Sequence, residues 1–101
     1  MHRNIEWDTP GQASVSQYYS HEKNYDTTPY PGLILSARHQ GKIARVKVEA
    51  YKEGVSIGEV VALIDPHSGE RLKQHGKLEL GDTVRLPDDK RSFEPQEPDD
   101  D

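Results

Sequence analysis

The fold is decided by residues 43–51, which read Ile43-Ala44-Arg45-Val46-Lys47-Val48-Glu49-Ala50-Tyr51. Between residues 44 and 50, apolar side chains occupy the even positions and charged side chains the odd ones, so the two kinds face opposite sides of an extended chain. An amphipathic helix would need apolar residues spaced three and four apart, a pattern that is absent here. The stretch therefore predicts a half-buried β-strand.

Turn signals bound this strand on both sides, at Gln40-Gly41 and at Lys52-Glu53-Gly54. Residues 55–64 then alternate in their first half and are continuously apolar in their second, with Gly58 at the changeover, which predicts a β-bulge. Further short apolar stretches and turns give about five strands between residues 33 and 86 and no helix. We therefore expect an all-β or mainly β domain, a small five-stranded barrel or sandwich.

The core is predicted from the apolar phase of each expected strand. Five residues lie on that phase or in the continuous apolar run: Val46, Val48, Leu63, Leu78 and Val84. Residues 78–86, Leu-Glu-Leu-Gly-Asp-Thr-Val-Arg-Leu, also resemble the Leu-x-x-Gly-Asp-x-Val-x-Leu turn of many small β-barrels. Translation-factor barrel domains, swapped-hairpin barrels and phage connector proteins use it, so the resemblance implies a barrel hairpin and assigns no family.

Charge divides the chain into three segments. Residues 1–29 form a polar, Tyr-containing arm with two Lys/Arg against four Asp/Glu, which we expect to be disordered or loosely docked. Residues 30–87 form the compact β domain, with nine Lys/Arg against seven Asp/Glu. Residues 88–101 hold two Lys/Arg against seven Asp/Glu, and we expect them to be a disordered acidic tail.

Composition excludes several classes of function. The chain has no cysteine, which rules out disulfides, thiolate metal sites and a cysteine nucleophile. It has no apolar run of the ~18 residues that a membrane span needs, and its first residues lack the apolar region of a signal peptide. We therefore expect a cytoplasmic protein without a membrane contact.

No catalytic or metal signature is recognisable. The five histidines lack the short spacings that place two ligands on one metal ion. Asp65, His67 and Ser68 are explained by turn chemistry, because close neighbours in one turn cannot easily aim at one another. We expect no cofactor and no metal.

The most suggestive cluster is a basic one around the first predicted strands. It comprises Arg38, His39, Lys42, Arg45 and Lys47, to which Tyr25 of the arm and Tyr30 at the start of the β domain are added. Cations that pair with phosphates beside rings that stack on bases make a nucleic-acid surface. The same residues are also explained by a solvated strand face with tyrosines that pack on the domain.

Three functions stay open. The sequence favours a non-enzymatic interaction module that binds a protein partner through a sheet edge, the Tyr-containing arm, or both. The first alternative is a nucleic-acid-binding barrel that uses the face from Arg38 to Lys47, with a domain charge of only +2 against it. The second is a small enzyme or toxin without a recognisable motif. The sequence does not define the oligomeric state.

Overall fold

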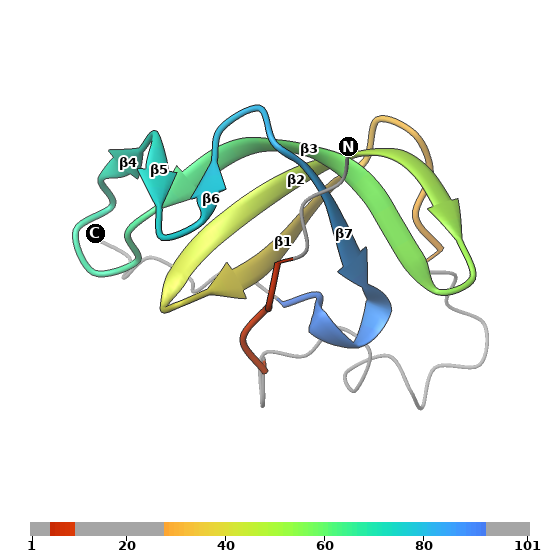
Figure 1. Cartoon of the computed structure of the whole chain (residues 1–101), viewed down its shortest axis with the longest axis horizontal. Coiled ribbons are helices and arrows are strands. Elements are labelled where there is room, and N and C mark those ends of the chain that lie inside the picture. Colours follow the sequence, from red (N-terminus) through yellow and green to blue (C-terminus); the bar gives the residue numbers. More distant parts are fainter. Residues whose placement is uncertain (1–4, 10–27, 93–101) are drawn as a thin grey trace, which may run out of the picture.

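The computed structural model describes residues 5–9 and 28–92, most of which lie in β-strands. In chain order, the elements are β1 (Ile34–His39), β2 (Lys42–Lys52), β3 (Val55–Ile64), β4 (Arg71–Leu72), β5 (Gln74–His75), β6 (Leu78–Glu79), β7 (Thr83–Pro87) and the 3-10 helix η2 (Asp88–Lys90). Figure 1 shows that the longer strands form a curled sheet, a half-barrel. The expected all-β, barrel-like fold is confirmed.

Strand β3 is the centre of the sheet because it pairs along both of its sides. On one side it pairs antiparallel with β2, which pairs in turn with β1. On the other side, β7 pairs with residues 55–59 of β3, and β4 pairs with residues 63 and 64. This arrangement gives a five-stranded sheet, and β5 and β6 form a second, two-stranded sheet.

The core lies on the inner face of the curled sheet. Its buried apolar side chains are Trp7, Leu35, Ala37, Ala44, Val46, Val48, Val60, Leu63, Leu78, Val84 and Leu86. All five core residues predicted from the sequence belong to this set, so the predicted strand phase is confirmed for residues 44–48 of β2. Burial of apolar area at ~25 cal/mol per Å² makes this cluster the main source of stability.

Ala50 breaks the alternation that the sequence predicted. Val48 pairs with Gly58 and Ala50 with Ile57, so Glu49 is an extra residue in β2. This bulge shifts the phase, and Ala50 is exposed where the sequence predicted it to face the core. The bulge expected at Gly58 therefore has its extra residue in the opposite strand. Gly58 is needed there because a Cβ would lie 2.2 Å from the carbonyl oxygen of Lys47.

A second bulge explains the continuously apolar half of β3. Arg45 pairs with Ala62 and Val46 with Val60, which leaves Val61 without a partner in the register. Val61 is accordingly exposed between buried neighbours. The run is apolar throughout because the bulge places both Val60 and Ala62 in buried positions.

Two segments next to the chain ends close the open side of the half-barrel. In the first, Trp7 is buried in the core, its indole Nε1 donates to the carbonyl of Arg85 in β7 (2.7 Å), and the amide of Asp8 donates to the carbonyl of Arg38 in β1 (2.7 Å). In the second, Arg91 forms a β-bridge with Ala37 in β1. Trp7 is therefore a core residue, although the sequence left it in the arm.

Residues 88–92, which the sequence assigned to the acidic tail, continue the fold through η2 and this bridge. The rest of the expected arm and tail, residues 1–4, 10–27 and 93–101, lies outside the described residues. Tyr25 is among them.

Candidate functional site

The outer face of the sheet brings three of the predicted basic residues together. In the antiparallel pair of β1 and β2, Arg38 is opposite Ile43 and Ser36 is opposite Arg45. Opposite residues in such a pair point to the same side, so Arg38, Arg45 and Lys47 lie along one face. We call this surface the outer face. It includes Ile34, which is opposite Lys47.

His39 does not belong to the outer face. Its side chain is 4% exposed and follows Leu35 and Ala37 to the inner side of β1. Its Nδ1–H donates to the carbonyl of Glu6 (2.9 Å), because a carbonyl can only accept. Its ring meets Trp7 edge to face, with centroids 6.2 Å apart. His39 therefore helps to hold the N-terminal segment.

Lys42 does not belong to the outer face either, because it is opposite His39 in the β1–β2 pair and so points to the inner side. Its Nζ lies 3.5 Å from a carboxylate oxygen of Asp65, in the turn after β3. The backbone amide of His67 donates to the same carboxylate and, with help from the Lys42 charge, lowers the pKa of Asp65. Lys42 is thus already paired with a carboxylate of its own chain.

Apolar side chains are exposed beside the basic ones. Ile34, opposite Lys47, is 46% exposed, and Val61, next to the residue that pairs with Arg45, is 40% exposed. Tyr30 precedes β1 and is 60% exposed. An exposed surface that combines apolar side chains with arginine has the composition of many protein interfaces.

A pocket of about 350 Å³ lies at the end of the outer face. It is lined by Asp8 and Thr9 from the N-terminal segment, Arg38, Gly41 and Ile43 from the β1–β2 hairpin, and Pro66 and His67 from the turn after β3. Its volume is at the lower end of the range of ~300–1,000 Å³ that is usual for small-molecule sites. Three separate parts of the chain therefore converge on it.

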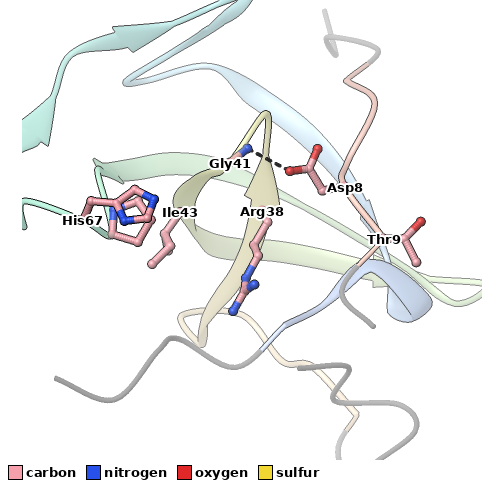
Figure 2. Close-up of a pocket in the computed structure, with 7 residues that line it drawn as sticks. Asp8, Thr9, Arg38, Gly41, Ile43 and His67 are labelled. Carbon is pink, nitrogen blue, oxygen red and sulfur yellow. Dashed lines mark hydrogen bonds between the residues drawn. The ribbon is translucent and has the colours of Figure 1, made fainter. Parts of the chain in front are cut away.

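Asp8 forms one wall of the pocket, and its carboxylate is hydrogen-bonded there to backbone amides. Its two carboxylate oxygens accept hydrogen bonds from the amides of Gln40 and Gly41, each 2.9 Å long. Gln40 has a φ of +49°, which is unfavourable for a residue other than glycine, so these bonds stabilise a strained turn. Figure 2 shows the carboxylate beside the Gly41 amide.

Arg38 is the residue with unused binding capacity. Figure 2 shows its guanidinium extending away from Asp8, and its buried Nε has no hydrogen-bond partner within the described residues. A buried donor that lacks a partner costs about 1–3 kcal/mol. A carboxylate or phosphate oxygen that enters the pocket would pair with the guanidinium charge. The pocket can therefore hold an anionic group, with Ile43 as its apolar wall.

Sequence reasoning found Arg38 but missed the other polar groups of the pocket. Asp8 and Thr9 reach it only because Trp7 docks in the core, and no local pattern indicates that contact. The position of His67 near the β1–β2 hairpin could have been inferred, because the turn at residues 65–69 directly follows a strand that pairs with β2.

Comparisons with models of protein families, with curated proteins and with solved structures find no match to this chain. In the described ranges, no three His, Asp or Glu side chains gather in a way that would hold a metal ion. The same ranges contain no helix that is both long and apolar enough to cross a membrane.

Proposed function

We propose that the protein is a non-enzymatic interaction module that binds a protein partner on the outer face of β1 and β2. The observation that carries this proposal is the pocket lined by Arg38, which opens on a face with exposed Ile34 and Val61. The partner offers an acidic side chain to Arg38 and apolar side chains to the rest of the face.

A face fits this role better than the sheet edge that the sequence suggested. The outward carbonyls of Ser36 and Arg38 on the β1 edge already accept the amides of Ser92 and Asp8. A partner strand would have to displace both segments before it could pair there. Tyr30 is exposed close to the start of β1 and supplies an aromatic anchor beside the face.

Charge supports an acidic partner. Arg38, Arg45 and Lys47 lie on the outer face, and Glu59, opposite Lys47 in β3, opposes them. Complementary charge of this kind mainly speeds association and selects the partner. A cytoplasmic location, drawn from composition, belongs to the same proposal.

Nucleic-acid binding is the second candidate, because the same cations share a face and Tyr30 is exposed nearby. Phosphates would pair with the cations, and a base would stack on the ring. This candidate differs in one measurable respect: its affinity falls steeply with salt.

The test is a peptide-display selection on the immobilised full chain, followed by titration of a single-stranded oligonucleotide at ~50 and ~200 mM salt. We expect enriched peptides that combine Asp or Glu with apolar residues. Their binding is lost in the Arg38→Gln/Arg45→Gln variant and kept in Lys52→Gln/Lys73→Gln, which removes the same charge from exposed positions elsewhere.

Two outcomes contradict the proposal. Selected peptides that bind the Arg38→Gln/Arg45→Gln variant as well as the wild type show that the outer face is not the binding surface. An oligonucleotide that binds tightly at low salt and releases at high salt, without any enriched peptide, favours the nucleic-acid candidate.

A further inference from the structure

The N-terminal segment Ile5–Thr9 packs between β1 and β7, and we call the site that receives it the groove. Figure 1 draws it in red beside β1. It uses backbone acceptors of both strands, since Trp7 Nε1 donates to the carbonyl of Arg85 and the Asp8 amide donates to the carbonyl of Arg38. Main-chain hydrogen bonds to a sheet edge, combined with a side-chain pocket, are the means by which β-proteins bind extended peptides.

Three side chains of this segment make specific contacts in the groove, and one does not. Trp7 is 7% exposed in the core, and Ile5 packs against the same cluster. Asp8 accepts the two turn amides of Gln40 and Gly41. Glu6, by contrast, has an exposed side chain and contributes its carbonyl, which accepts from His39. The side chains at residues 5, 7 and 8 therefore make the contacts, which gives the pattern apolar-x-Trp-Asp.

The chain also supplies this segment on a long connection. Eighteen residues, 10–27, join the segment to the residues before β1. At up to ~3.3–3.6 Å per residue, such a connection can span about 60 Å. The segment of one molecule can therefore reach the groove of another and make the same contacts there, which is the condition for a low-cost exchange between identical chains.

We propose that the groove between β1 and β7 is a recognition site for an apolar-x-Trp-Asp segment, and that a second copy of this chain supplies that segment in exchange for the groove's own. The inference goes beyond the proposed function, because it concerns the inner side of the half-barrel and needs no partner on the outer face. The two sites adjoin at Asp8, which lines the pocket and bonds the backbone of Arg38 and Gly41, two further lining residues.

Trp7 is the chain's only tryptophan, which makes the test direct. The full-length Trp7→Ala variant is free of tryptophan and leaves its groove without an indole. A capped synthetic peptide of residues 5–9 is the probe, since it presents the segment as a second copy would. We expect its tryptophan emission to shift to shorter wavelength and to saturate as the Trp7→Ala chain is added.

Two altered peptides serve as controls. The peptide with Asp8→Ala lacks both turn hydrogen bonds, so we expect about tenfold weaker binding, equivalent to about 1.4 kcal/mol. The peptide with Glu6→Ala keeps every contact that the structure gives to this position, so we expect unchanged binding. Equal binding of the two altered peptides contradicts the proposed pattern.

Folding of the acceptor does not decide the outcome. If the Trp7→Ala chain is unfolded alone, the peptide should restore its dispersed amide NMR spectrum. A peptide that produces neither an emission shift nor such recovery overturns the recognition site.

The exchange itself is tested with isotope-labelled Trp7→Ala chain and unlabelled wild type at ~1 mM, the order of concentration at which a segment of a second molecule can compete with a tethered one. We expect intermolecular NOEs from the Trp7 indole to labelled β7 amides. Their absence, where the peptide does bind, rejects the second copy as the donor.

Discussion

The β2–β3 hairpin and the N-terminal segment Ile5–Thr9 bury apolar side chains in one core by different means. The hairpin contributes a series of small and medium residues whose burial repeats along two paired strands. The segment contributes mainly Trp7, fixed by a few contacts to residues more than thirty positions away. Periodic burial distributes stability over many positions, whereas closure of the half-barrel concentrates it at very few.

Trp7→Ala should have the largest effect on stability. Loss of a buried Trp typically costs about 3–5 kcal/mol, and here it also leaves the carbonyl of Arg85 without its indole donor. Urea denaturation followed by circular dichroism measures the change. Tyr30→Ala, an aromatic truncation at an exposed position, should change stability by less than ~0.5 kcal/mol. Equal effects of the two changes would mean that Trp7 does not close the half-barrel.

Val48→Ala should be the next largest. Val48 is buried on the inner face of β2, and such truncations destabilise by roughly 1–3 kcal/mol. Val61→Ala is the matched control, since it removes the same two methyl groups at an exposed bulge position and should cost less than ~0.5 kcal/mol. If both variants unfold at the same urea concentration, the assigned strand phase and the second bulge are wrong.

Asp8→Ala should destabilise by about 1–2 kcal/mol, because two turn amides lose a charged acceptor and Gln40 keeps its positive φ. The loss should also speed hydrogen exchange at the amides of Gln40 and Gly41. Glu6→Ala, a neighbouring acid with an exposed side chain, is the control and should leave both quantities unchanged. Exchange rates that do not respond to Asp8→Ala contradict the capping role.

Tyr51→Phe should have the smallest effect, about 0.5–1 kcal/mol for one half-exposed hydrogen bond. The Tyr51 hydroxyl donates to the carboxylate of Asp88 in η2, and this bond raises the pKa of Tyr51 above its usual 10.0. A raised pKa means that the contribution is present below pH 10 and is lost as pH rises through the folded-state pKa.

The wild type and Tyr51→Phe should therefore differ at pH 7 and converge in strongly alkaline solution. Tyr30→Phe is the control for any general effect of the hydroxyl. A stability difference that grows with pH would show that the tyrosine is not the donor.

The sequence predicted the burial pattern that repeats along a strand and missed features that occur at a single position, such as a bulge or a docked side chain. Alternation between residues 44 and 48 correctly predicted a strand and its buried face, but the extra residue Glu49 reversed the phase at Ala50. Grouping by charge placed His39 with Arg38, although Leu35, Ala37 and His39 alternate toward the core. Trp7 stands among polar neighbours and is buried through contacts with β1 and β7, which no local pattern reveals.

The central claim is that Trp7 closes the half-barrel between β1 and β7, and hydrogen exchange at its indole N–H tests this most directly. A single indole signal exists because the chain has one tryptophan. We predict that the Nε1 hydrogen, bonded to the carbonyl of Arg85, exchanges as slowly as the amides of β3 and shows NOEs to β7. An indole hydrogen that exchanges at the rate of a free peptide, with no NOE to β7, would contradict the account.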